Sequence, residues 1–128
     1  MRARVLLADD HPGMLESVAN LLRDEFDVVA TVGEGEAAVT AAALLQPDVA
    51  VLDISMPNLT GIEAAERVRA FEGPKAVRVV FLTVHDDPEF IEAAGNVGAV
   101  GYVLKRRIAK DLLPAVRRAA SPDPAESA

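Results

Sequence analysis

The chain has 128 residues and a formal net charge of −7, from 13 basic and 20 acidic side chains. This length fits one domain, because folding at this size buries roughly two thirds of the surface of the unfolded chain. The charge argues against direct nucleic-acid binding, which is built from Lys and Arg. There is no Cys, so there is no disulfide framework and no thiol chemistry.

Membrane and export signals are also missing from the sequence. No apolar run approaches the roughly 18 residues that a membrane span needs. Only four apolar residues precede Asp9 after the basic start, too few for the core of a signal peptide. We therefore expect a cytoplasmic protein that contacts no membrane.

Five short apolar segments alternate along the chain with five segments of helical pattern. The predicted strands are residues 5–8, 27–32, 49–52, 76–83 and 101–104. The predicted helices are residues 11–25, 36–46, 60–71, 88–97 and 111–120. Such alternation predicts βαβ units with right-handed crossovers, and so an α/β fold whose parallel sheet is covered by helices on both faces. The strands are almost continuously apolar, which is typical of strands buried on both sides.

Gly and Pro set several of the predicted helix boundaries. Gly73-Pro74 closes the third helix, and Gly95 weakens the fourth by up to about 1 kcal/mol relative to Ala. In the last helix, Asp111 is the predicted N-cap. Pro114 then falls in the first turn, where backbone N–H groups have no intrahelical partner in any case.

The end of the chain differs in composition from the rest. Residues 121–128 contain two Pro and no apolar pattern, which predicts a disordered tail or the start of an interdomain linker. Residues 1–120 are the predicted domain.

Polar residues follow four of the predicted strands. They are Asp9-Asp10, Asp53, Thr83 and Lys105. In an open parallel sheet the carboxyl ends of the strands border the ligand crevice, so these side chains should gather there. Clustered carboxylates repel, and one should have a raised pKa unless a cation neutralises them. Hard oxygen ligands of this kind suit Mg²⁺, which often shares its coordination with phosphate oxygens, and Lys105 is then a fixed partner for that phosphate.

A second motif favours a different function. Residues 33–38 fit the G-x-G-x-x-A dinucleotide fingerprint between a strand and a helix, with Asp53 about 20 residues further on. However, Glu34 and Glu36 would place negative charge at the helix end that should receive the pyrophosphate. The motif also leaves the other strand-end residues without a role, but a dinucleotide-binding α/β domain remains an alternative.

Two other kinds of site fit the residues less well. A phosphatase with Asp53 as nucleophile would usually carry an Asp two residues later, where this chain has Ser55. A zinc site at His11 and His85 would lack enough ligands, because the chain has no Cys.

The loop from Asp53 to Gly61 carries the most specific motif in the chain. Together with Met56 and Pro57, these residues match the phosphoacceptor loop of the receiver domain of bacterial two-component response regulators, which the chain resembles over residues 4–120. The sequences Asp9-Asp10-His11 and Gly101-Tyr102-Val103-Leu104-Lys105 are most similar to the NarL/FixJ (LuxR-type) subfamily.

The resemblance implies a fold and a function. The fold is a five-stranded parallel sheet of flavodoxin-like (CheY-like) doubly wound topology, with strand order 2-1-3-4-5. The function is that of a phosphoacceptor rather than an enzyme, one that catalyses only its own phosphorylation by a sensor histidine kinase and slow autodephosphorylation. The chain would be the receiver part of a DNA-binding transcriptional regulator, or alternatively a stand-alone single-domain regulator.

The resemblance also implies a role for each site residue. Asp53 accepts the phosphoryl group, and Mg²⁺ is held by Asp9, Asp10, Asp53 and the backbone carbonyl of Ser55. Thr83 and Lys105 contact the phosphoryl group, and Thr83 and Tyr102 act as the switch. The output would be a phosphorylation-dependent homodimer through the fourth helix, fifth strand and fifth helix. Arg106 departs from the family, because many receivers have Pro there, often after a cis peptide bond.

Overall fold

The structure of this chain is a computed structural model that describes residues 2–70 and 76–121. Its parallel strands form one five-stranded sheet in the order β2-β1-β3-β4-β5, which confirms the predicted topology. The strands are β1 (Arg4–Ala8), β2 (Asp27–Val32), β3 (Val49–Asp53), β4 (Arg78–Thr83) and β5 (Gly101–Leu104). The bounds of β2 and β5 are those predicted, whereas β4 begins two residues later than expected.

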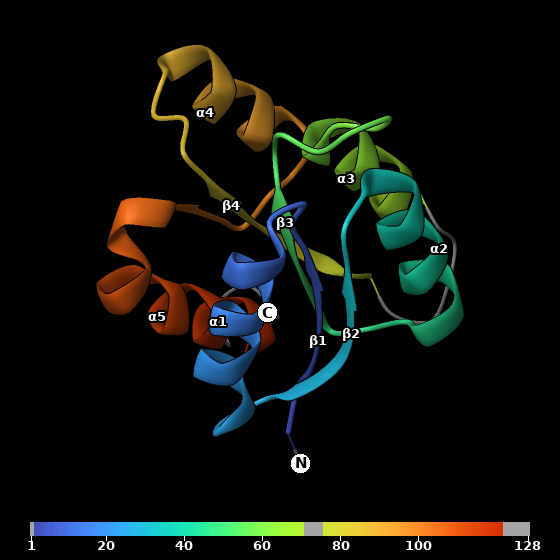
Figure 1. Cartoon of the computed structure of the whole chain (residues 1–128). Helices are drawn as coiled ribbons and strands as arrows, with labels where there is room; N and C mark the ends of the chain where they lie inside the picture. Colours follow the sequence, from blue (N-terminus) through green and yellow to red (C-terminus); the bar gives the residue numbers. More distant parts are fainter. Residues whose placement is uncertain (1, 71–75, 122–128) are drawn as a thin grey trace, which may run out of the picture.

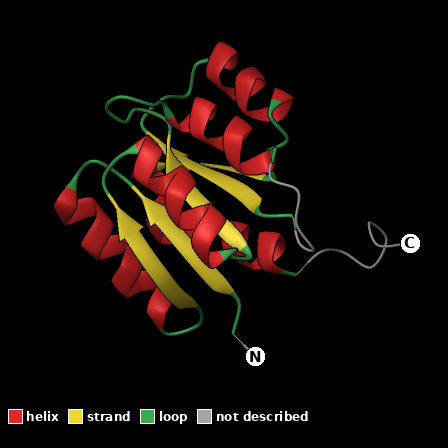
Figure 2. Cartoon of the chain, turned by 90° about the vertical axis from the view of Figure 1, so that its right-hand side faces the viewer, coloured by secondary structure: helices red, strands yellow, loops and turns green. Residues whose placement is uncertain are grey.

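Helices cover both faces of the sheet, as predicted (Figures 1 and 2). They are α1 (Pro12–Arg23), α2 (Gly35–Leu45), α3 (Gly61–Arg69), α4 (Pro88–Asn96) and α5 (Ile108–Ala120), with a 3₁₀ turn, η1 (Lys105–Arg107), before α5. The first four begin within one residue of the predicted positions. The predicted end of the third helix at residue 71 and its closure by Gly73-Pro74 lie outside the described residues.

The sheet separates two apolar clusters. Successive residues of a strand point to opposite faces, so Leu6 packs on one side and Val5 and Leu7 on the other. The cluster around Leu6 includes side chains from α2, α3 and α4, and the cluster around Val5 includes side chains from α1 and α5. The central strands therefore lie between two layers and are fixed in position by burial on both sides.

The predicted start of the last helix is wrong. α5 begins at Ile108, directly after η1, so Arg107 and not Asp111 is at the N-cap position. Pro114 therefore lies inside the helix, where its ring removes one backbone hydrogen bond. The buried stripe Leu112, Ala115, Val116 and Ala119 holds the helix on the sheet despite that loss. Asp111 instead forms an ion pair at 2.8 Å with Arg107, one turn earlier.

No helix in the described part of the chain is long and apolar enough to cross a membrane.

Candidate functional site

Two carboxylates and one ammonium group meet at the carboxyl ends of the strands. Asp9 follows β1 and Asp53 ends β3, and both are buried, with 3% and 4% of their surface exposed. Lys105 follows β5, and its Nζ lies 2.8 Å from Asp9 Oδ2 and 3.0 Å from Asp53 Oδ2. The three side chains come from three different strands, so the strand order 1-3-4-5 and the parallel direction of the sheet bring them together.

Backbone N–H groups fix the polar side chains at three strand ends in the same way. The N–H of His11 donates to Asp9 Oδ1 at 2.9 Å, and that of Ser55 donates to Asp53 Oδ1 at 3.1 Å. The N–H of residue 85 donates to Thr83 Oγ1, also at 3.1 Å. In each case the donor lies two residues after the acceptor, which is the geometry of Asx and Ser/Thr turns. Each carboxylate is thus held by one oxygen and presents the other to Lys105.

Burial and charge shift the pKa values of this site in a consistent pattern. Burial raises the pKa of the Asp53 carboxyl above its usual value, against the lowering effect of Lys105, and the charge of Asp9 raises it further. Burial lowers the pKa of the Lys105 ammonium, but its contacts with Asp9 and Asp53 more than compensate, so the net shift is upward. Lys105 therefore stays charged and is the cation that offsets the two buried carboxylates.

The oxygens near Asp9 suit a hard divalent cation. Ligand atoms of Asp9, Asp10 and His11 lie within 4.8 Å of one another, and Asp10 is exposed. Asp9 Oδ2 is buried and has no hydrogen-bond partner of good geometry among the described residues, although Lys105 Nζ forms an ion pair with it. Carboxylate oxygens with spare acceptor capacity are the donors that Mg²⁺ prefers. The residues present therefore fit this ion.

His85 connects three parts of the site that the sequence pattern does not link. Its ring Nε2 is 2.8 Å from Ser55 Oγ, and the ring stacks on that of Phe90 in α4 with centroids 4.4 Å apart. Its backbone carbonyl accepts a hydrogen bond of 2.7 Å from the Tyr102 hydroxyl in β5. The β4–α4 loop is thus joined to the β3–α3 loop, to α4 and to β5 through a single residue. The sequence analysis considered His85 only as a zinc ligand together with His11 and did not predict these contacts.

The β3–α3 loop is held close beneath Asp53. The N–H of Gly61 donates to the carbonyl of Ile54 at 2.8 Å, and a Cβ at Gly61 would lie 2.1 Å from the Asp53 carbonyl oxygen. Only Gly permits this approach. Thr60 and Glu63 then form a capping box that starts α3. The Gly of the motif is therefore needed to pack the helix against the backbone of Asp53.

The geometry contradicts the dinucleotide alternative. A Cβ at Gly35 would lie 2.2 Å from the Leu59 carbonyl oxygen, so the β3–α3 loop fills the space at the N-terminus of α2. Asn58 also donates a hydrogen bond of 3.3 Å to Glu34. The second Gly of the motif therefore serves helix-to-loop packing, and Glu34 and Glu36 place negative charge where a pyrophosphate would bind.

Comparison with known proteins identifies the family. The model of the response regulator receiver domain matches residues 5–117. This chain belongs to that family. It is 39% identical over 121 residues to the nitrate/nitrite response regulator protein homolog of Haemophilus influenzae, a match that covers 93% of this chain and 57% of that protein. It is 34% identical over 119 residues to the transcriptional regulatory protein PdtaR of Mycobacterium tuberculosis, which covers 92% of this chain and 57% of the relative.

Solved receiver structures agree with this assignment. The signal receiver domain of the putative response regulator NarL from M. tuberculosis superposes with a TM-score of 0.88 at 34% identity, over 95% of this chain and 98% of the other. A LuxR-family response regulator from Aurantimonas gives a TM-score of 0.86 at 32% identity, over 98% of this chain and 94% of the other. The predicted NarL/LuxR relationship is confirmed.

The receiver family consists of signalling domains of two-component systems rather than of classical enzymes. Its members are phosphorylated by histidine kinases and generally use Mg²⁺. The chain spans about half the length of the curated relatives it matches. The Lys105-Arg106 peptide bond is trans, like the other peptide bonds of the described residues.

Proposed function

We propose that this chain is the phosphoacceptor of a two-component system and that Asp53 takes a phosphoryl group from a phosphohistidine of a sensor histidine kinase. The observation that carries the proposal is the position of Asp53, buried at the end of β3 with Lys105 Nζ 3.0 Å from its Oδ2. A carboxylate oxygen of Asp53 attacks phosphorus, the bond from phosphorus to the histidine nitrogen breaks, and the imidazole leaves with its electron pair. An acyl phosphate on Asp53 results, which water hydrolyses slowly.

The residues around Asp53 have distinct tasks in this transfer. Asp9, Asp10, Asp53 and the backbone carbonyl of Ser55 would hold Mg²⁺, which supplies neutralisation of the charge on the transferred phosphoryl oxygens. Lys105 pairs with the new phosphoryl group, since its ammonium already lies between the two buried carboxylates. Thr83 donates its hydroxyl to a phosphoryl oxygen. The oxygen of the same hydroxyl accepts from the N–H of residue 85, so a movement of Thr83 toward the phosphoryl group also moves that turn.

The response passes from Thr83 to the β4–α4 loop and Tyr102. A phosphoryl group adds about two negative charges, and drawing Thr83 toward it changes the turn that positions His85. The carbonyl of His85 holds the Tyr102 hydroxyl, so a shift of this loop releases or redirects that ring. We propose that the changed surface of α4, β5 and α5 then favours a homodimer.

The chain acts as the receiver part of a DNA-binding transcriptional regulator and does not bind nucleic acid itself. Curated relatives such as PdtaR support this proposal. PdtaR is a transcriptional regulatory protein, and the matched region covers 57% of it. The net charge of −7 also disfavours contact with a phosphate backbone.

Phosphoryl uptake tests the proposed function. The protein is incubated with a small phosphodonor and Mg²⁺, and its intact mass is measured for the wild type, Asp53→Asn and Asp10→Asn. We expect one phosphoryl group on the wild type, none on Asp53→Asn, and slower uptake on Asp10→Asn because one Mg²⁺ ligand is lost. Equal uptake by the wild type and Asp53→Asn would refute the assignment.

A further inference from the structure

The side chain of His11 lies beside the carboxylates of the cation site and does not cap the helix that it precedes. His11 is at the N-cap position of α1, but its side chain makes no capping hydrogen bond. Ser, Thr, Asp and Asn are preferred at this position because their side chains accept such bonds. The imidazole ring also makes no hydrogen bond to another of residues 2–70 and 76–121. Its nitrogens are therefore available to a ligand.

The ring nitrogen Nδ1 of His11 lies among carboxylate oxygens. It is 3.7 Å from Oδ1 of Asp10, and ligand atoms of Asp9, Asp10 and His11 all lie within 4.8 Å of one another. Atoms that bind one ion at about 2.1 Å are about 3.4 Å apart in tetrahedral geometry and about 3.0–4.2 Å apart in octahedral geometry. A small movement of the three side chains therefore brings them to the same ion.

The backbone holds His11 in this place, whereas its ring is free to turn. The N–H of His11 donates to Asp9 Oδ1 at 2.9 Å, which fixes the position of the residue relative to the buried carboxylate. The His11 side chain is 76% exposed, so it loses rotamer freedom when it binds an ion. Asp9 Oδ2 has an ion pair with Lys105 but no hydrogen bond of good geometry among the described residues. The group thus combines a fixed carboxylate with an adjustable ligand at the surface.

The charge at this end of the strands favours a cation. The carboxylates of Asp9, Asp10 and Asp53 outnumber the single ammonium group of Lys105, which lies between two of them. A divalent cation reduces the repulsion among these carboxylates.

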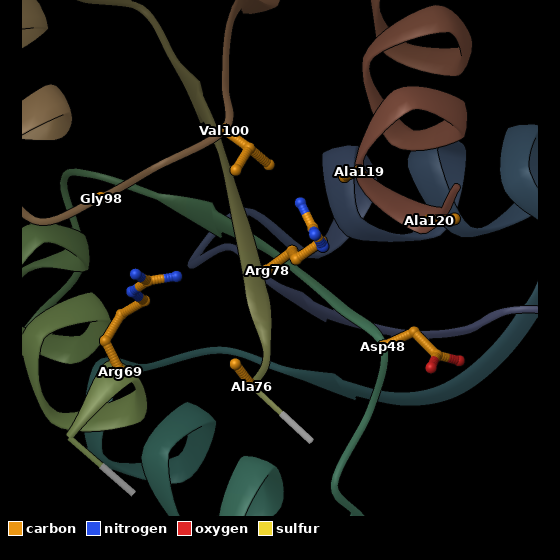
Figure 3. Close-up of a pocket in the computed structure, with 8 residues that line it drawn as sticks. All are labelled: Asp48, Arg69, Ala76, Arg78, Gly98, Val100, Ala119 and Ala120. Carbon is orange, nitrogen blue, oxygen red and sulfur yellow. The ribbon is translucent and has the colours of Figure 1, made fainter. Parts of the chain in front are cut away.

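The pocket at the opposite end of the strands is not comparable as a cation site. It has a volume of about 610 Å³ and lies beside the start of β4 and the end of α5 (Figure 3). Among the described residues that line it, Asp48 is the one acidic side chain. Asp48 Oδ2 already accepts a hydrogen bond of 2.8 Å from the N–H of Arg4. A cation is therefore better served by the carboxylates near His11.

A nitrogen ligand changes which ions a site prefers. Mg²⁺ prefers oxygen ligands and keeps several of its waters, so an imidazole adds little to its binding. For Ni²⁺ and Zn²⁺ an imidazole nitrogen is a favoured ligand. Three protein ligands with water in the remaining position are enough for Zn²⁺. Asp9, Asp10 and His11 supply three, and His85, the partner considered in the sequence analysis, instead directs its Nε2 to Ser55 Oγ.

We propose that Nδ1 of His11 is a ligand of the divalent cation together with Asp9 and Asp10. This nitrogen raises the preference of the site for Zn²⁺ over Mg²⁺ beyond what the carboxylates alone give. The inference rests on the cation site of the proposed function and adds to it one ligand and an ion selectivity. Zn²⁺ and Mg²⁺ then compete for the same two carboxylates, and a bound Zn²⁺ joins the start of α1 to the site.

Isothermal titration calorimetry of the unphosphorylated chain without a histidine tag measures the Kd of Zn²⁺ and of Mg²⁺ at one fixed pH. In His11→Ala we expect Zn²⁺ binding to weaken about tenfold, the lower end of the range for lost metal-site contacts because the ring is exposed, and Mg²⁺ binding to change by less than about twofold. Asp10→Asn should weaken the binding of both ions. Glu16→Gln is the matched control and should change neither, because it removes an exposed charge of α1 outside the ligand group.

The ¹⁵N signals of the imidazole ring identify the ligand atom. The Nδ1 signal of His11 should shift on addition of Zn²⁺ far more than on addition of Mg²⁺. Equal Zn²⁺ affinity in the wild type and His11→Ala, an equal loss for both ions, or coordination through Nε2 would overturn the proposal. So would a loss of Zn²⁺ binding in His11→Ala that Asp10→Asn does not share, because the ion would then bind the ring alone.

These measurements are independent of phosphoryl transfer. They use the unphosphorylated chain, so a failure of Asp53 to take up a phosphoryl group would appear in the mass measurement and leave the Zn²⁺ result unchanged. Conversely, Mg²⁺ binding without the expected effect of His11→Ala on Zn²⁺ would overturn this inference and leave the proposed function standing.

Discussion

The helices α3 and α4 have the same length, nine residues, but are held in very different ways. α3 starts with a capping box and buries Gly61, Ala64, Ala65 and Val68. α4 has no side-chain cap and buries only Ala94. A helix with few buried contacts opens or shifts at low cost. The loop after Asp53 therefore leads into a firmly packed helix, whereas the loop after Thr83 leads into a loosely packed one.

The loops that precede α3 and α4 are also held in different ways. The β3–α3 loop is fixed by backbone packing, because Gly61 lies against Asp53. The β4–α4 loop is held mainly by side chains, through the contacts of His85 with Ser55, Phe90 and Tyr102. The close contact of Gly61 with the backbone of Asp53 cannot break unless the surrounding chain unfolds. The side-chain contacts of His85 can be replaced by others while the protein stays folded. We infer that chemistry at Asp53 is transmitted by movement of the second loop while the first stays in place.

Two Gly→Ala substitutions give the largest expected contrast between these regions. In Gly61→Ala the new Cβ would lie 2.1 Å from the Asp53 carbonyl oxygen, so the backbone must move, and we expect a loss of about 3 kcal/mol in the free energy of unfolding. In Gly95→Ala nothing lies within 4 Å of the new Cβ, and we expect a gain of up to about 1 kcal/mol from helix propensity. Urea unfolding of both variants measures the two values.

Changes of the same sign in the free energy of unfolding of the two variants would contradict the described difference between α3 and α4. A stable Gly61→Ala protein would show that the loop beneath Asp53 is able to relax. A destabilised Gly95→Ala protein would show that α4 packs more tightly than its burial indicates.

The pH dependence of stability tests the electrostatics of the fixed site. The pKa of Asp53 is raised in the folded state above its usual value of 3.8, so the folded state holds this proton more tightly than the unfolded state. Ionised Asp53 therefore lowers the free energy of unfolding. This loss grows as the pH rises from 3.8 through the raised pKa, and it is constant above that pKa. Asp53→Asn should gain stability relative to the wild type over that interval. The free energies of unfolding of both proteins are measured without divalent ions. A difference between them that stays constant or declines as the pH rises through this interval would contradict the expectation.

His85→Ala should have a smaller effect, confined to the second loop. It removes the contact with Ser55 and the stacking on Phe90, so we expect a loss of about 1 kcal/mol in the free energy of unfolding. His11→Ala is the control, because His11 is exposed and its side chain does not cap α1, and we expect a change of under about 0.5 kcal/mol. Equal losses in both variants would mean that His85 does not specifically hold α4.

Much of this site could be predicted from the sequence, because strand ends are easy to recognise. Asp9, Asp53 and Lys105 each follow a continuous apolar run, and parallel pairing brings such positions to one edge. The network of His85 could not be predicted, since stacking and hydrogen bonding depend on how two loops approach each other. The start of α5 was misplaced because Asp111 resembles an N-cap, while η1 leads the chain directly from β5 into the helix.

Amide hydrogen exchange with and without a beryllofluoride phosphoryl mimic and Mg²⁺ tests the central claim most directly. If chemistry at Asp53 is transmitted through the loosely held helix, exchange in α4 and in the Thr83–Asp87 loop should change severalfold, while exchange along α3 stays the same. Asp53→Asn should show neither change. An equal change in α3 and α4, or a change in α4 that persists in Asp53→Asn, would contradict the account.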